Sequence, residues 1–318
     1  MNFKFALTIC LNLLLMQSQF AQAAFVVNLQ FDDVLNNTGV GFDDPTHGLA
    51  RRDTVQSVMN YVSSQLDPSV YSTAIDYRIQ NSQMDGSGFL ASSGPYLFSS
   101  PNGYGNGFVY DHATTGIDPS GGFPDSIATF DFGYNWHPGT SANPGGLFDL
   151  FSVTLHEFTH SMGFLTLMNS SGVSSISGTD PGVFGVFASF LERGDGTQLF
   201  GPGGDFLGNL GDLTSDDVFF DGPNATAANG GNPIKIYAPG TFQPGSSFAH
   251  LDPMLNALMN PSFGPGVEKR EWTTYDSAIL QDIGWEFSGA TAVPEPGSFF
   301  SCCSRCAERL TANASSFE

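Results

Sequence analysis

Two histidines and a glutamate within residues 156–160 form the part of the chain best suited to chemistry. His156 and His160 stand four residues apart, and Glu157 directly follows the first of them. On a helix, histidines at this spacing share one face and can bind one metal ion, while the glutamate can reach a water molecule on that ion. A metal ion, a water molecule and a base are the minimum for metal-assisted hydrolysis. These residues predict a hydrolytic metal site with Glu157 as its catalytic base.

The segment around this motif has the hydrophobic period of a helix. Gly163 follows the last apolar position and predicts the end of that helix. A helix over 148–162 would bring both histidines to one face, which makes two unrelated surface or packing histidines the poorer interpretation. The apolar residues that recur in steps of three and four are Phe148, Phe151, Leu155, Phe158 and Met162.

Two histidines leave a catalytic zinc site incomplete, because such a site takes three protein ligands and keeps one position open for water. In one large group of zinc peptidases a third histidine follows the helix-ending glycine by three residues, but this chain has Thr166 there. Glu192 is the only glutamate between the motif and Glu268, and it would supply a carboxylate ligand. His250 is the other candidate.

The order of motifs over residues 148–285 resembles the leishmanolysin branch of the metzincin zinc peptidases. The chain reads HEFTHSMGF over 156–164, AHLD around His250, LMNP over 258–261 and then YDSAILQDIGW. In that branch a long insertion precedes the third histidine, and a methionine-containing turn follows it. The resemblance implies an α+β fold, a two-lobed zinc metalloprotease domain with a mixed sheet and the active-site helix in the N-terminal lobe.

Carried over residue by residue, the resemblance implies one catalytic Zn²⁺. Its ligands would be His156, His160 and His250, and Glu157 would be the general base. Gly163 would end the helix, and Met259 would form a hydrophobic floor beneath the metal. The implied activity is that of a secreted endopeptidase acting on peptide or protein substrates. The chain lacks the family's cysteines and a clear pro-segment.

Two other functions remain open from the sequence. One is a non-catalytic surface or matrix protein with a structural zinc site, and Glu157 argues against it because zinc binding alone does not need a base. The other is a zinc hydrolase that acts on a different amide.

Further polar residues near the motif have simpler predicted roles. Ligating imidazoles usually donate their second N–H to an oxygen, and Asp149 and Asp252 are the predicted acceptors. The remaining histidines, His47, His112 and His137, stand beside Gly, Pro or Asp and are interpreted as solvated or locally hydrogen-bonded loop residues.

The charge of the chain limits its partners. Ten Lys and Arg against 31 Asp and Glu give a net charge of −21, which repels nucleic acid and anionic membranes, so neither is expected as a partner. The Asp/Gly/Asn-rich stretches 41–48 and 204–222 make calcium a second candidate cofactor. Neither stretch has the spacing of an EF-hand loop, so solvated turns are favoured.

Hydrophobic periodicity and turn residues predict an N-terminal lobe over about 24–165 and a loop-rich C-terminal lobe over about 166–287. Short strands are expected between the turns of 71–122. The predicted strands are 25–31, 126–132 and 235–238, and the predicted helices are 53–66, 148–162, 183–191 and 274–283, the last with Thr273 or Thr274 as its N-cap.

The two ends of the chain suggest export. Residues 1–23 have the basic start, apolar core and Ala21-Gln22-Ala23 site of a secretory signal peptide. In the segment 288–318, residues 292–296 read AVPEP and resemble the start of the PEP-CTERM sorting signal of exported bacterial proteins. No apolar span follows, so the tail is interpreted as a truncated or frame-shifted signal, from which neither membrane anchoring nor processing follows. The expected location is the envelope or exterior of a Gram-negative bacterium.

Overall fold

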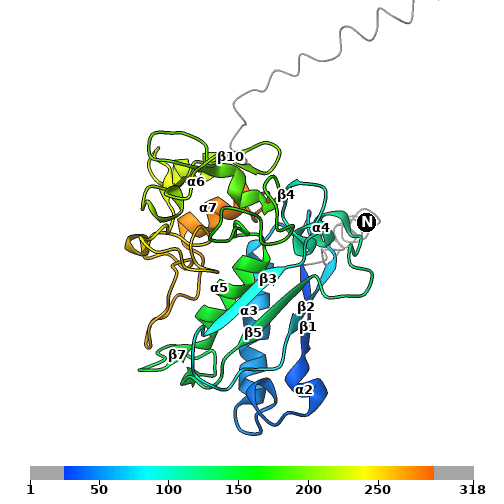
Figure 1. Ribbon diagram of the computed structural model, residues 1–318. Helices are drawn as coiled ribbons and strands as arrows, with labels where there is room; N and C mark the ends of the chain where they lie inside the picture. The colour runs from blue at the N-terminus through cyan, green and yellow to red at the C-terminus, as the bar shows by residue number, and fades with distance from the viewer. Residues whose placement is uncertain (1–24, 290–318) are drawn as a thin grey trace, which may run out of the picture. The chain divides into compact units, whose positions relative to one another are not determined.

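A four-stranded sheet with two long helices packed against it is the framework of the protein (Figure 1). The computed structural model describes residues 25–289, and the described residues as far as Ser288 belong to one compact unit. Helices and sheets both contribute, which confirms the α+β class. The predicted signal peptide, and residues 290–318 of the predicted tail, lie outside the described residues.

The main sheet is mixed, as expected. Its strand order is β1-β2-β5-β3, in which β1, β2 and β5 are parallel and β3 is antiparallel to β5. Side chains alternate between faces along a strand, so the buried Ile75, Tyr77 and Ile79 of β2 all point towards the core. The bounds are β1 (Val26–Phe31), β2 (Ala74–Ile79), β3 (Ala91–Pro95) and β5 (Ser126–Phe130).

Helices α3 and α5 lie next to each other, and both contact the sheet. The expected helix over 53–66 is confirmed but begins earlier, at Gly48, after a turn in which Asp44 accepts hydrogen bonds from the Thr46 and His47 N–H groups. The expected helix over 148–162 is confirmed with narrower bounds. Within residues 25–289 the helices are α2 (Asp32–Asn36), α3 (Gly48–Gln65), α4 (Phe108–Thr115), α5 (Leu150–Ser161), α6 (Pro223–Ala228) and α7 (Thr274–Asp282).

Between α5 and α7 the chain is mostly loop, and its regular elements besides α6 are short strands and 3₁₀ turns. They are β8 (Val183–Gly185), β9 (Leu191–Glu192), β10 (Phe200–Gly201), β11 (Asp205–Phe206), β12 (Phe219–Phe220), β13 (Ile234–Lys235), η2 (Val186–Phe190), η3 (Asp212–Thr214) and η4 (Pro253–Leu255). Earlier in the chain lie β4 (Gly103–Gly105), β6 (Trp136–His137), β7 (Phe148–Asp149) and η1 (Gly41–Asp43).

The expected helix over 183–191 is wrong. Residues 183–185 instead pair in parallel with β4, and a 3₁₀ turn follows. Gly185 also donates its N–H to the Thr166 carbonyl at 3.1 Å and lies so close to Leu165 that a Cβ would be 2.1 Å from the Leu165 oxygen. This packing between distant segments outweighs the local helical period of the apolar residues. The expectation of strands alone over 71–122 is also incomplete, because α4 lies within that stretch.

The last helix is confirmed with Thr273 as its N-cap. The Thr273 hydroxyl accepts from the Asp276 N–H at 3.3 Å, and the Asp276 carboxylate accepts from the Thr273 N–H at 2.8 Å, which completes a capping box. No helix within residues 25–289 combines the length and the apolar character that crossing a membrane requires.

We expect Trp285→Phe to lower the free energy of unfolding by about 1–3 kcal/mol, measured by urea denaturation. The Trp285 ring is fully buried against Phe25, Tyr71 and Tyr110, and its Nε1–H donates to the Met162 carbonyl at 2.7 Å. The substitution keeps an aromatic ring but leaves that buried carbonyl without its donor. Phe123→Leu, at a side chain that is 75% exposed, is the control and should change stability by less than about 0.5 kcal/mol.

Candidate metal centre

Helix α5 begins and ends at residues that fix its position. The Asp149 side chain caps the helix by accepting from the Ser152 N–H at 3.1 Å. Gly163 follows the helix with φ of +100°, and a Cβ there would lie 3.2 Å from the Asn106 carbonyl oxygen. A glycine is therefore required where the chain turns away from α5.

Three histidines meet in the lining of one cleft. His156 and His160 lie on α5, and His250 lies in the loop between β13 and η4; all three are buried. The Nε2 atom of His250 is 3.1 Å from the Nε2 atom of His156 and 3.1 Å from that of His160. The fold thus joins two residues of one helix to a third that follows ninety positions later.

Every one of these imidazoles is oriented by a backbone carbonyl. The Nδ1 of His156 bonds the Leu258 oxygen at 3.0 Å, and the Nδ1 of His160 bonds the Phe164 oxygen at 2.8 Å. The Nδ1 of His250 bonds the Ser246 oxygen at 2.9 Å. Because a carbonyl can only accept, each Nδ1 must carry the proton, and each neutral ring presents an unprotonated Nε2.

Three unprotonated nitrogens that face one another repel unless a cation lies among them. Burial keeps the rings neutral: it lowers the pKa of His156 well below its ordinary value, that of His160 to about 4 and that of His250 to about 3. Tetrahedral zinc with Zn–N bonds of about 2.0–2.1 Å holds its nitrogen ligands about 3.3 Å apart. The donor type, the tautomer and the spacing of the three rings therefore fit Zn²⁺.

Glu157 lies beside this cluster and lines the same cleft. Burial raises the pKa of its carboxyl group to about 8, and the backbone N–H of Ser93 acts in the opposite direction. A divalent cation next to the carboxyl group would favour its ionised form. The arrangement places a proton acceptor within reach of the same space that the three Nε2 atoms face.

The cleft has a volume of about 690 Å³. One wall is β3, the edge strand of the main sheet, which is held to α5 where the Ser93 and Ser161 hydroxyls bond at 2.6 Å. The other walls are mostly apolar or small. They include Val153, Leu165, Leu167, Met168, Pro244, Gly245, Ala249, Pro261 and Phe263.

Met259 is fully buried in the turn that follows His250, and Asp276 holds that turn in place. The Asp276 carboxylate accepts from the Leu258 and Met259 N–H groups, both at 3.1 Å. It thereby fixes the Leu258 carbonyl that orients His156. Asp276 was not identified from the sequence; its position three residues after an N-cap threonine signalled a capping box and no more.

The alternatives for the third ligand lie elsewhere. Glu192 is on β9, where its carboxylate accepts from Gln198, and it does not join the histidines. Thr166 lies three residues after Gly163, where many zinc peptidases have their third histidine, and its hydroxyl donates to the Phe248 carbonyl. Thr166 therefore anchors the loop that carries His250.

The predicted roles of Asp149 and Asp252 as acceptors for ligating imidazoles are wrong. Asp149 caps α5 and forms a bidentate ion pair with Arg270, in which Nη2 is 2.6 Å from Oδ1 and Nε is 2.9 Å from Oδ2. Asp252 caps η4 through the Met254 N–H and lies 3.4 Å from Lys235 Nζ. Backbone carbonyls, rather than these two aspartates, accept the Nδ1–H groups of the three imidazoles.

The other histidines differ in their surroundings. His47 is exposed before α3, as expected. His112 is buried on α4 and bonds Asp125 at 2.8 Å, so its assignment to a loop is wrong. His137 lies on β6, with Nδ1 3.5 Å from an Asp149 oxygen, and is likewise not a loop residue. Among the described residues, those of 41–48 and 204–222 contribute to no group of metal-ligating side chains.

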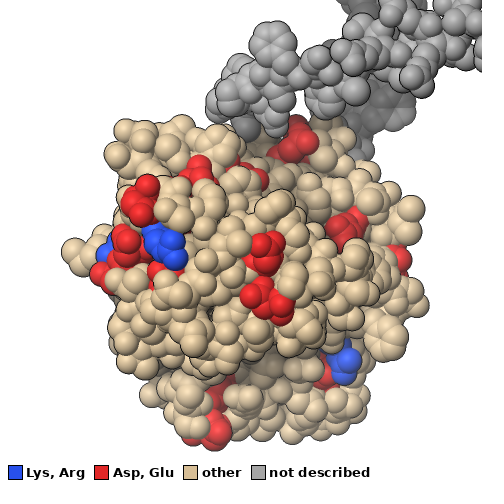
Figure 2. Space-filling view, turned by 45° about the horizontal axis from the view of Figure 1, so that its top comes forward, with Lys and Arg blue, Asp and Glu red and all other residues tan. Residues whose placement is uncertain are grey.

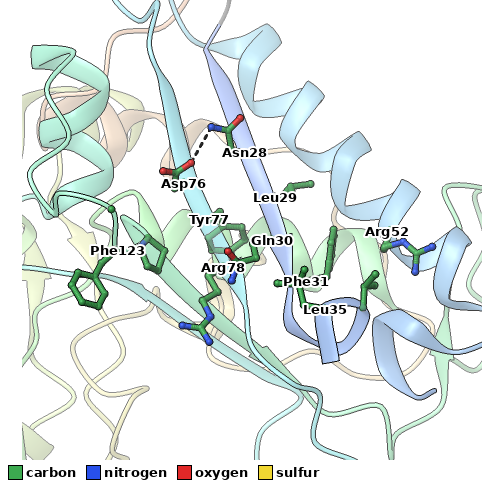
Figure 3. A pocket seen from close by; sticks show the side chains of 13 residues that line it. Asn28, Leu29, Gln30, Phe31, Leu35, Arg52, Asp76, Tyr77, Arg78 and Phe123 are labelled. Atoms are coloured by element: carbon green, nitrogen blue, oxygen red, sulfur yellow. Dashed lines mark hydrogen bonds between the residues drawn. The ribbon is translucent and has the colours of Figure 1, made fainter. Parts of the chain in front are cut away.

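A second cavity, of about 520 Å³, lies beside β1 and β2 (Figure 3) and contains none of the predicted site residues. Two of its polar groups are paired: the Asn28 amide donates to Asp76 at 2.9 Å (Figure 3), and Arg78 pairs with Asp32, outside the lining, at 2.8 Å. It offers no converging set of unpaired catalytic groups.

The surface carries its acidic excess without a basic patch on the face shown in Figure 2. Acidic side chains are scattered over that face, and the basic side chains visible there lie next to acidic ones. No protein-family model matches the chain, and no curated protein and no solved structure matches it either.

Replacing Arg270 should reveal how much the cap of α5 depends on charge. Burial raises the pKa of Asp149, but hydrogen bonds from Arg270 and Ser152 outweigh it and leave the pKa below its ordinary 3.8. The ion pair therefore stabilises the fold above pH 3.8, and this contribution is lost as the pH falls through the lowered value.

We expect Arg270→Met to cost roughly 2–4 kcal/mol at pH 7, because it leaves a buried carboxylate unpaired, and to cost less near pH 2. Urea denaturation at both pH values measures the difference. A cost that does not depend on pH would contradict this role of the pair.

We also expect His250→Ala to weaken zinc binding by at least about 10–100-fold, measured by competition with a chromogenic chelator. The substitution removes one of the three converging nitrogens. His47→Ala, at an exposed histidine outside the cluster, should bind zinc as the wild type does. Equal affinity in both variants would remove His250 from the ligand set.

Proposed function

We propose that the protein is a secreted, zinc-dependent endopeptidase with a two-lobed, metzincin-like catalytic domain of the leishmanolysin type. One observation carries the proposal: the unprotonated Nε2 atoms of His156, His160 and His250 converge in a cleft that also contains the carboxyl group of Glu157. The substrate would be a peptide or protein, with zinc as the catalytic ion.

The zinc ligands would be the three histidines, whose backbone-bonded Nδ1 atoms hold the rings in one tautomer and one orientation. When bound, the ion supplies Lewis acidity, which makes water a nucleophile near neutral pH and polarises a carbonyl group. The position of Glu157 suits it to accept the proton of the attacking water and then to donate it to the leaving amine. Burial of the carboxyl group excludes bulk water from that transfer.

The shape of the cleft favours an extended peptide as the substrate. Strand β3 is at the edge of the main sheet and lines the cleft, so a peptide can bind alongside it through backbone hydrogen bonds. The residues of β3 are partly exposed rather than buried, so this edge is accessible to a chain that extends past the site on both sides.

The number of converging ligands also argues against a purely structural zinc site. Structural zinc is enclosed by four protein ligands, whereas the described residues bring three histidines together here, and Glu157 lines the same cleft without joining the group. A structural site would gain nothing from a buried carboxyl group at this position.

We expect Glu157→Gln to bind zinc as the wild type does and to hydrolyse casein at least about 10²–10⁴-fold more slowly, because it removes proton transfer and keeps the shape of the side chain. Hydrolysis is measured at equal zinc content. Glu192→Gln, which changes a glutamate outside the cluster, is the matched control and should keep full activity.

Equal casein hydrolysis by the wild type and Glu157→Gln would contradict the role of Glu157. Absence of hydrolysis in the zinc-loaded wild type, across casein and a set of unstructured peptides, would contradict the peptidase itself.

A further inference from the structure

A second group of metal-ligating side chains lies away from the histidine cluster and shares no residue with it. His112 is in the last turn of α4, Asp125 directly precedes β5, and Asp118 lies in the loop between them. One donor atom from each of these three residues lies within 4.8 Å of the other two. The loop therefore brings an imidazole and two carboxylates to one point.

Asp125 is held in place by hydrogen bonds to one of its two carboxylate oxygens only. Its Oδ2 accepts from His112 Nδ1 and from the Asp76 N–H, both at 2.8 Å. Its Oδ1 is buried and has no hydrogen-bond partner, although the residue is only 1% exposed. A buried carboxylate oxygen without a partner costs free energy, so its presence calls for a ligand.

The charges around Asp125 make the unpaired oxygen more costly. Burial raises the pKa of Asp125, and the negative charge of Asp118 raises it further, while the contacts with His112 and Asp76 lower it. Within residues 25–289, neither Asp118 nor Asp125 forms an ion pair with a Lys or Arg. A divalent cation would supply the charge that the protein does not.

Asp118 is arranged to offer a charged oxygen. Its Oδ1 accepts from the Ser120 and Gly121 N–H groups, at 2.7 and 3.0 Å, and its Oδ2 accepts only from the Gly122 N–H, at 3.0 Å. The hydrogen bonds with Ser120 in particular lower the pKa of Asp118, so the carboxylate stays ionised, and Oδ2 keeps a free lone pair.

We propose that His112, Asp118 and Asp125 bind a second divalent ion of the zinc class. The imidazole distinguishes this site from a calcium site, because Ca²⁺ takes oxygen ligands, whereas zinc accepts both imidazole nitrogen and carboxylate oxygen. The ion would replace the proton that His112 Nδ1 shares with Asp125 Oδ2, and the proton would pass to solvent. It would join the end of α4 to the start of β5 and give Asp125 Oδ1 a partner. This site is independent of the proposed peptidase activity.

The test is the amount of zinc bound per chain by the full-length protein, measured by elemental analysis after dialysis against buffered free zinc. We expect Asp118→Asn to bind one ion fewer than the wild type. Asp111→Asn, at an acid of α4 that is outside the group, should bind as many ions as the wild type. The double variant Asp118→Asn/His250→Ala should lose two ions, which shows that the sites are separate.

An unchanged zinc content in Asp118→Asn would overturn the proposal, and so would an equal loss in Asp111→Asn. Displacement of this ion by millimolar Ca²⁺ would overturn its assignment to the zinc class. Anomalous diffraction from wild-type crystals at the zinc edge provides a readout without any substitution. A peak beside His112 is expected, and a peak at the histidine cluster alone would contradict the second site.

Discussion

The arrangement of the candidate centre depends on three hydrogen bonds from imidazole to backbone. Each Nδ1 donates to a carbonyl, and this contact decides which nitrogen carries the proton and where the lone pair points. A carboxylate acceptor would bring a charge that has to be neutralised, whereas a carbonyl dipole orients the ring without adding one. The fold therefore confines three lone pairs to a small volume and leaves their repulsion to be relieved by a cation.

Remote parts of the chain contribute to that confinement. Thr166 fixes the Phe248 carbonyl on one side of His250, and Asp276 fixes the turn at Leu258 on the other. Asp276 also caps α7, so the last helix and the orientation of His156 depend on the same carboxylate. The stability of α7 and the geometry of the histidine cluster are thus coupled through Asp276.

The sequence predicted those helices and site residues that depend on neighbouring residues in the chain. Helical period located α5, an N-cap threonine located the start of α7, and residue types at fixed spacing singled out His156, Glu157 and His160. Contacts between segments that are distant in the chain could not be predicted from local patterns. The pairing of β8 with β4 replaced an expected helix, and Arg270, 121 residues after Asp149, diverted that acid from its expected role. No local pattern distinguishes an acid that caps a helix from one that supports a ligand.

Backbone orientation of the ligands has an evolutionary consequence. Every amino acid has a carbonyl group, so the residues at Phe164, Ser246 and Leu258 can change without loss of the acceptors, provided that the chain keeps its path there. The requirement falls on the turns and on the few side chains that hold them. Related centres can therefore drift far apart in sequence around an unchanged set of histidines, and comparison of backbone paths will trace their ancestry further than comparison of residues.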